Sequence, residues 1–157
     1  MRELVVNNYP KSSVTESIKM IRANLRFSSI NKNVKTILVT SSIAGEGKSF
    51  ISANLSAVFT TEKEKVLLID CDLRKPKIHK NFGLMRNHGV SDVVLSKGTL
   101  DYKQAIQIYK KNDLRLDVLT AGSKISNPSE LINSEGFARL LKETKDDLPI
   151  EKEENDE

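Results

Sequence analysis

A glycine-rich loop between an apolar run and a helical pattern constrains the fold of this chain more than any other feature. The apolar run covers residues 36–40, and the loop covers residues 42–49, with Gly45 and Gly47 just before Lys48. This strand–loop–helix order is typical of a phosphate-binding loop, because backbone N–H groups and the helix N-terminus point at the anion. The loop departs from the G-x-x-x-x-G-K-[ST] pattern only at its first position, Ser42, and a chance Gly-Lys-Ser turn is the alternative.

The side chains after the glycines carry the charge and the hydroxyl group that a bound nucleotide needs. Lys48 would reach the β- and γ-phosphates, and the Ser49 hydroxyl would ligate Mg²⁺. We therefore predict ATP and Mg²⁺ as cofactors. The predicted nucleotide-binding residues are the loop and the residue after it: Ser42, Ile43, Ala44, Gly45, Glu46, Gly47, Lys48, Ser49 and Phe50.

Two acidic residues follow the next apolar run. Residues 66–69 have the pattern of a buried strand, and Asp70 and Asp72 come directly after it. Ligands of open α/β sheets bind at the carboxyl ends of strands, where an Asp can hold Mg²⁺ or accept a proton from a hydroxyl nucleophile. On a continuing strand both acids would point to one side. The alternative is that they only end the strand and solvate the turn before Pro76.

These residues form the predicted active site. The expected catalytic residues are Lys48, Asp70 and Asp72, and the expected metal ligands are Ser49, Asp70 and Asp72.

The remaining pattern alternates between strands and helices. Strands are expected at 35–40, 65–70 and 114–119, and helices at 13–28, 90–96 and 101–109. Ser13 to Glu16 reads as a capping box for the first helix. A last helix is expected to start at Asn127, with Asn127 as its cap and Pro128 in its first turn. This order predicts an α/β fold with a three-layer, doubly wound parallel sheet.

Four sequence blocks occur together in one order. They lie at residues 41–49, 68–76, 119–122 and 127–131, the last two reading Leu-Thr-Ala-Gly and Asn-Pro-Ser-Glu-Leu. As an ordered set they resemble the bacterial tyrosine kinases (BY-kinases), P-loop proteins of capsular and exopolysaccharide synthesis. The resemblance extends from about residue 14 to about residue 141. It implies an autokinase that transfers the ATP γ-phosphoryl group to a tyrosine hydroxyl, with Asp70 and Asp72 as the acids of its second motif.

The resemblance also implies partners. The kinases carry an E-x-x-R-x-x-R motif that acts between subunits, and this chain has Glu16, Lys19 and Arg22 at those positions. A homo-oligomer through the Glu16–Arg22 helix is therefore expected, although Lys19 cannot make the two-pronged carboxylate contact of an Arg. The alternative is a solvated amphipathic helix. The resemblance implies that a family member without a membrane segment is activated by a separate membrane-bound polysaccharide co-polymerase. Such a protein is the predicted partner here.

The sequence after residue 141 departs from the resemblance. Residues 142–157 hold three Lys and eight Asp or Glu, which gives this segment a net charge of −5. Since the whole chain has a net charge of +4, residues 1–141 have a net charge of +9. The kinases continue here into the Walker B strand, which would lie beside the phosphate-loop strand. We expect a partial P-loop domain over 1–141, incomplete at its C-terminus, and an acidic, disordered tail over 142–157.

Two other functions stay open at this stage. One is an inactive nucleotide-binding or regulatory remnant. The other is a partition or division-site ATPase, but those proteins carry an extra Lys early in the loop that Ser42 and Ile43 do not supply.

Composition bears on the cellular location of the chain and on whether it binds nucleic acid. A single Cys excludes a disulfide framework, and no apolar run approaches the ~18 residues of a membrane helix. The first residues are too polar for a signal peptide, so a cytoplasmic chain is expected, with attachment to the inner face of the membrane through a partner. Lys and Arg are scattered without interleaved aromatics, so nucleic-acid binding is not expected.

Overall fold

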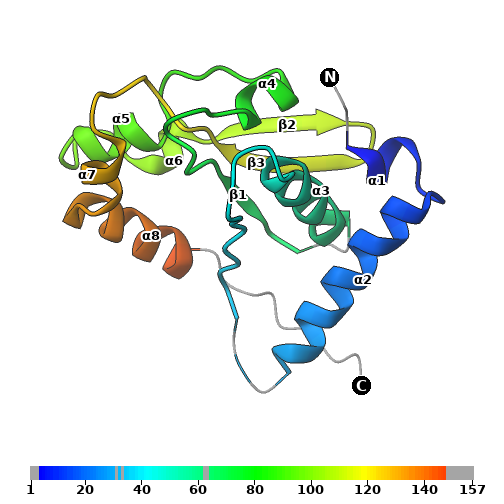
Figure 1. Ribbon diagram of the computed structural model, residues 1–157. Coiled ribbons are helices and arrows are strands. Elements are labelled where there is room, and N and C mark those ends of the chain that lie inside the picture. The colour runs from blue at the N-terminus through cyan, green and yellow to red at the C-terminus, as the bar shows by residue number, and fades with distance from the viewer. Residues whose placement is uncertain (1–3, 31, 33, 62–63, 148–157) are drawn as a thin grey trace.

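The computed structural model describes residues 4–30, 32, 34–61 and 64–147 as a mixed α/β fold (Figure 1). This confirms the predicted fold class. In chain order the elements are α1 (Val5–Asn8), α2 (Ser13–Ser28), α3 (Lys48–Thr61), β1 (Leu67–Ile69), α4 (Ile78–Phe82), α5 (Val90–Leu95), α6 (Tyr102–Ala105), β2 (Gln107–Lys111), β3 (Leu114–Leu119), α7 (Pro128–Ile132) and α8 (Glu135–Asp147).

The sheet separates two apolar cores. Its three strands lie in the order β1-β3-β2, with β1 parallel to β3 and β2 antiparallel to β3. Successive residues of a strand point to opposite faces, so Leu68 packs in the core with α3 and α4, whereas Leu67 and Ile69 pack in the core with α5, α7 and α8. Two helical layers therefore cover one sheet.

The predicted helix over 101–109 is wrong in its second half. Helix α6 ends at Ala105, and Gln107 already pairs with Val118 of β3. The cause is a two-residue hairpin turn at Asn112 and Asp113, where Asn112 has a φ of 53°. Asn tolerates this left-handed conformation better than most residues, and primed turns of this kind favour it.

The predicted helix from Asn127 is two helices. The Ser134 hydroxyl accepts a hydrogen bond from the Phe137 N–H at 3.2 Å, which starts α8 as a separate element. Asn127 makes no side-chain cap and instead donates to Glu130 at 3.2 Å. The expected boundary after residue 141 falls inside α8, which continues to Asp147, and the rest of the expected tail, 148–157, lies outside the described residues.

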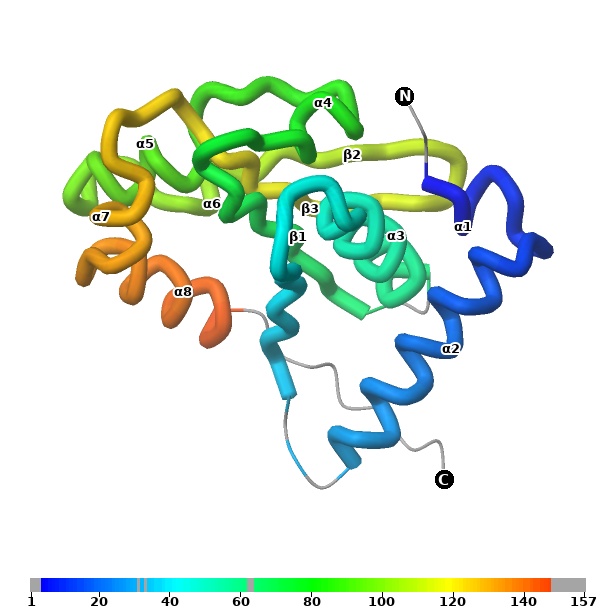
Figure 2. The backbone as a smooth tube through the Cα atoms, in the orientation of Figure 1, coloured from blue at the N-terminus to red at the C-terminus, as the bar shows by residue number. Residues whose placement is uncertain are grey.

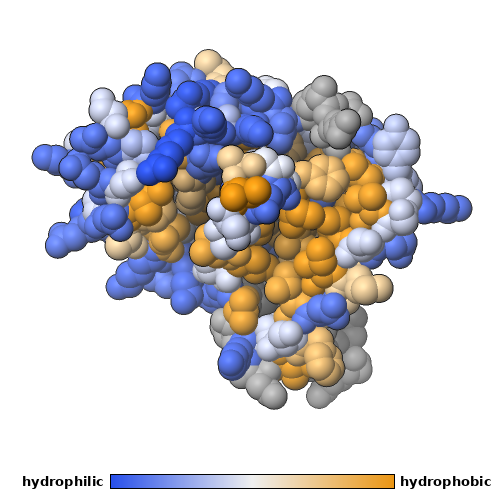
Figure 3. Space-filling model, in the orientation of Figure 1, coloured by the Kyte–Doolittle hydropathy of each residue, from blue (hydrophilic) through white to orange (hydrophobic). Residues whose placement is uncertain are grey.

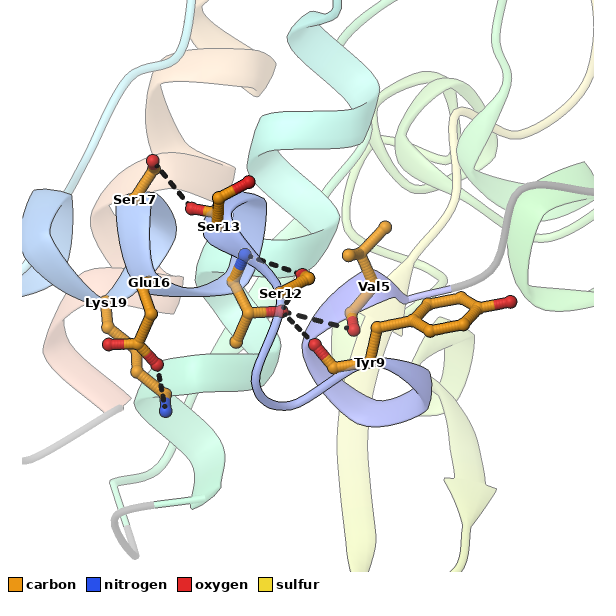
Figure 4. A network of polar contacts seen from close by, with 8 residues as sticks. Val5, Tyr9, Ser12, Ser13, Glu16, Ser17 and Lys19 are labelled. Carbon is orange, nitrogen blue, oxygen red and sulfur yellow. Dashed lines mark hydrogen bonds and ion pairs between the residues drawn. The ribbon is translucent and has the colours of Figure 1, made fainter.

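The predicted helix over 13–28 is confirmed, but its cap is one residue earlier than expected. The Ser12 hydroxyl accepts from the Thr15 N–H at 3.1 Å, and the buried Thr15 hydroxyl donates to the Tyr9 carbonyl at 2.7 Å (Figure 4). Glu16 does not close a capping box and instead pairs with Lys19 at 3.0 Å. The cap ties the start of α2 to the segment before it.

The predicted strand over 35–40 is not formed as a strand. The run leads up to the loop before α3 (Figure 2), and among the described residues no strand pairs with it. A strand needs a hydrogen-bonded neighbour. Strand β1 pairs with β3 along one of its edges, and no described strand lies along its other edge. Ile37 and Leu38 are consequently 42% and 82% exposed.

Candidate functional site

The phosphate loop is shaped by two glycines. Gly45 and Gly47 have φ values of 90° and 95°, in the left-handed region that side-chain-bearing residues rarely adopt. A Cβ at either position would meet no atom within 4 Å, so conformation and not space requires glycine there. The loop ends where α3 begins at Lys48, so its N–H groups and the first turn of α3 lie together.

Lys48 is held over the loop. Its Nζ donates to the Ser41 hydroxyl at 2.7 Å and to the Ile43 carbonyl at 3.4 Å. The Ile43 N–H in turn donates to the Glu46 carboxylate at 3.2 Å. These contacts hold the Lys48 ammonium group against the loop.

Asp70 is buried at the end of β1. Its Oδ1 accepts from the Asp72 N–H at 3.1 Å and its Oδ2 from the Ile78 N–H at 3.2 Å. Burial raises the pKa of the Asp70 carboxyl and the Asp72 charge adds to this, while the two N–H groups oppose the rise. Burial and the Asp70 charge also raise the pKa of the Cys71 thiol to about 11, in keeping with a packed, protonated side chain.

Asp72 has a different environment from Asp70. The expected continuing strand is not present, because β1 ends at Ile69 and the chain turns. Asp72 is exposed, and its Oδ1 accepts from the Lys75 N–H at 2.9 Å. The two acids are therefore one buried and one exposed carboxylate, not an equivalent pair.

A groove joins the two motifs. It has a volume of about 3320 Å³ and is lined by the phosphate loop, by the end of β1, by the unpaired run over 34–41 and by one side of α8. Of the predicted site residues all but Glu46 line it, and Figure 3 shows how much apolar surface this face presents. The structure thus brings Lys48, Ser49, Asp70 and Asp72 to one groove. Their roles stay predictions.

The groove suits a metal that arrives with a nucleotide. Within residues 4–147, where described, no group of three or more His, Cys, Asp or Glu side chains could hold a metal ion. Mg²⁺ does not need such a cage, because it keeps several waters and binds through one or two carboxylates plus substrate phosphates. Ser49, Asp70 and Asp72 fit that use.

A contact between α5 and the loop after β3 was not predicted from the sequence. The Asp92 carboxylate accepts from the N–H groups of Gly89 at 2.9 Å and Ser123 at 3.0 Å, so it clamps α5 to this loop. Burial alone would raise the pKa of Asp92, but hydrogen bonds from Ser123 and Gly89 lower it overall. A Cβ at Gly89 would collide with the Thr120 carbonyl. No local sequence pattern signals this clamp, because Asp92 and Ser123 are 31 residues apart in the chain.

A loop with a fixed lysine at the start of a helix, beside acids at the end of a parallel strand, defines a P-loop nucleotide-binding domain. Residues 37–147 match the family described as the CobQ/CobB/MinD/ParA nucleotide binding domain, and the chain belongs to that family.

Relatives within the family are tyrosine kinases. The chain is 41% identical over 142 residues to the tyrosine-protein kinase YwqD of Bacillus subtilis strain 168, covering 90% of this chain and 58% of that protein. It is 39% identical over 140 residues to the putative tyrosine-protein kinase CapB of Staphylococcus aureus, covering 89% and 60%. The predicted kinship with bacterial tyrosine kinases is confirmed. The chain spans about three fifths of the length of these two relatives.

Solved structures are similar to this chain as well. The kinase domain of the Escherichia coli tyrosine kinase ETK superposes with a TM-score of 0.83 at 31% identity, covering 91% of this chain and 55% of that one. The chimerical protein CapA2B2 gives 0.79 at 38% identity, covering 90% and 60%. None of the helices in the described chain has the length and apolar character needed to cross a membrane.

Proposed function

We propose that this chain binds Mg·ATP in the groove and supplies the nucleotide site of a protein-tyrosine kinase in capsular or exopolysaccharide synthesis. The observation that carries the proposal is that Lys48, Ser49, Asp70 and Asp72 all line one groove. The names of the relatives, which are tyrosine-protein kinases, support the reaction class. The nucleotide would supply the γ-phosphoryl group, and Mg²⁺ would neutralise its charge.

The residues of the chain would act mainly by positioning and by charge, as in phosphoryl transfer generally. Lys48 and the first turn of α3 would bind the β- and γ-phosphates. Asp70 is fixed by two backbone N–H groups and would orient the metal through water. Asp72 is exposed at the rim, where it would accept the proton of an incoming tyrosine hydroxyl.

A nucleotide-binding regulatory role is the second candidate. It is favoured by one observation: among the described residues, the run that leads into the phosphate loop has no strand paired with it. A loop held less firmly would still bind nucleotide but would transfer phosphate slowly. A partition or division-site ATPase is not favoured, because the relatives reported above are kinases.

Calorimetry with Mg·ATP and Mg·ADP tests the nucleotide site. Lys48→Met should abolish measurable binding, because it removes the ammonium group fixed over the loop. Lys75→Met is the matched control, since Lys75 also lines the groove but lies outside the loop. Equal affinity of the wild type and Lys48→Met would contradict the proposal.

Two partners belong to the same proposal. We expect a membrane-bound polysaccharide co-polymerase to hold the chain at the inner face of the membrane, as the resemblance implies. Co-purification from detergent extracts with and without that protein tests this, and equal recovery counts against it.

We also expect self-association through α2, where Glu16 and Lys19 lie exposed on one face. Light scattering of the wild type and Glu16→Ala would show it, and an unchanged mass would exclude this face.

A further inference from the structure

The three tyrosines of the chain have different environments. Tyr102 is 5% exposed, and its hydroxyl donates to the Asp147 carboxylate at 2.7 Å. Tyr109 lies in β2, half-buried, with its ring 4.8 Å from that of Phe82 in an edge-on contact. Both side chains hold elements together, Tyr102 joining α6 to the end of α8 and Tyr109 joining β2 to α4.

Tyr9 is presented at the surface. Its side chain is 66% exposed, and Figure 4 shows the Tyr9 ring pointing away from Ser12 and the dashed contacts beside it. The backbone beneath it is fixed, because the Tyr9 N–H donates to the Val5 carbonyl at 2.8 Å and its own carbonyl accepts from Ser12 and Thr15. The backbone hydrogen bonds thus hold the exposed side chain in place, and among the described residues no hydrogen bond to the Tyr9 hydroxyl would be lost on modification.

Tyr9 lies outside the groove of its own chain. The groove lining includes Leu4 but not Tyr9. A phosphoryl group would have to come from the site of another molecule. The surroundings tolerate the new charge, since Lys11 is two residues away and exposed and α2 begins at Ser13.

We propose that Tyr9 is a phosphoacceptor, modified in trans by a tyrosine kinase of this family. The proposal rests on the proposed function. In the reaction a bond forms between the Tyr9 Oη and the γ-phosphorus of ATP, and the bond from that phosphorus to the β–γ bridging oxygen breaks. ADP leaves, and the phenolic proton passes to a carboxylate of the acting kinase. Tyr102 and Tyr109 are expected to be poorer acceptors in the folded chain, because the Tyr102 hydroxyl is buried on Asp147 and the half-buried Tyr109 ring packs against Phe82.

Site-resolved mass spectrometry after incubation with Mg·ATP tests the proposal in two arms. One arm holds the chain alone, and the other adds a small amount of the Bacillus subtilis relative named as a tyrosine-protein kinase, in a preparation that labels its own tyrosines under the same conditions. Four proteins are compared: the wild type, Tyr9→Phe, Tyr102→Phe and the double variant Tyr102→Phe/Tyr109→Phe, which keeps Tyr9 alone. With the added kinase we expect phosphate at Tyr9, a loss of at least ~10-fold in Tyr9→Phe, and an unchanged yield in the double variant.

The arms separate the two proposals. Label at Tyr9 only with the added kinase would support Tyr9 as the acceptor while counting against transfer by this chain itself. Label at Tyr102 or Tyr109 in Tyr9→Phe at the wild-type level would overturn the Tyr9 assignment. No label on this chain while the added kinase labels itself would overturn it too. Thermal unfolding of Tyr9→Phe at the wild-type temperature shows that any loss is not a folding defect.

Discussion

At the scale of the residue, the buried carboxylate of Asp70 ties nucleotide chemistry to stability. Both of its oxygens accept backbone N–H groups, and burial still raises its pKa. A raised pKa in the folded state means that the folded chain binds the proton more tightly than the unfolded chain. The contribution of Asp70 to the free energy of unfolding is therefore greatest below its unfolded pKa of about 3.9 and falls as the pH rises through its folded pKa.

Asp70→Asn should remove that pH dependence. We expect the free energy of unfolding of the wild type, relative to the variant, to fall as the pH is raised from about 3.9 through the folded pKa of Asp70. At neutral pH the variant should still be less stable, by about 1–3 kcal/mol, because the Asn amide group faces a backbone N–H that has lost its acceptor. Urea unfolding at several pH values measures both effects. A pH-independent difference would contradict the raised pKa.

Asp92 has the opposite titration. Its pKa is lowered, because the hydrogen bonds from Ser123 and Gly89 outweigh the effect of burial, so its stabilisation is present above the unfolded pKa and is lost as the pH falls through the folded pKa. Asp92→Ala should lower the free energy of unfolding by about 1–3 kcal/mol at pH 7, since two N–H groups lose their acceptor. Asp146→Ala, on the exposed side of α8, is the control and should change it by less than about 0.5 kcal/mol. Equal effects at both positions would show that the clamp adds nothing.

At the scale of the element, the start of α2 distinguishes two adjacent serines. Ser12→Ala should destabilise the chain by about 1 kcal/mol, because the Thr15 N–H loses the hydroxyl that caps it. Ser13→Ala should have little effect, since Ser13 is already inside the helix and exposed. Thermal or urea unfolding of the two variants decides the matter. A larger loss for Ser13→Ala would restore the capping box that the sequence pattern predicted.

The elements that the sequence predicted well are those whose signals are local. The phosphate loop, α2 and β3 follow from glycine position, helical spacing and an apolar run. The elements that it missed depend on partners distant in sequence. Residues 107–109 form a strand because β3 lies beside them. Residues 35–40 do not form a strand, because no described strand lies beside them. The Asn112 turn was readable in principle, since Asn is favoured where φ is positive.

The candidate site divides in the same way. Lys48 and Ser49 come from a local motif and their place at the start of α3 was predictable. The inequality of Asp70 and Asp72 was not, because it arises from the Ile78 N–H, eight residues on, which draws Asp70 inward. The Asp92 clamp joins residues 31 apart in the chain, which no local pattern reports.

At the scale of the whole molecule, one side of the groove is held by strand pairing and hydrogen bonds, and the opposite side is not. The end of β1 is held by pairing with β3 and by the Asp70 contacts. The run over 34–41, which leads into the phosphate loop, pairs with no strand in the part of the chain that the structure describes, and its Leu38 is 82% exposed. Transfer of a phosphoryl group depends on fixed geometry, and a displacement of about 1 Å can cost ~10²-fold in rate.

We therefore expect this chain alone to label tyrosine at least ~10-fold more slowly than a full-length relative at equal concentration, although it binds nucleotide. Incubation with labelled ATP and Mg²⁺, followed by phosphotyrosine detection over time, gives both rates. Asp70→Asn is the control for label that depends on the site, and Lys48→Met is the control for nucleotide binding. A rate equal to that of the relative, and lost in Asp70→Asn, would mean that the unpaired run over 34–41 does not limit the chemistry, because the loop is then held by α3 and its own contacts alone.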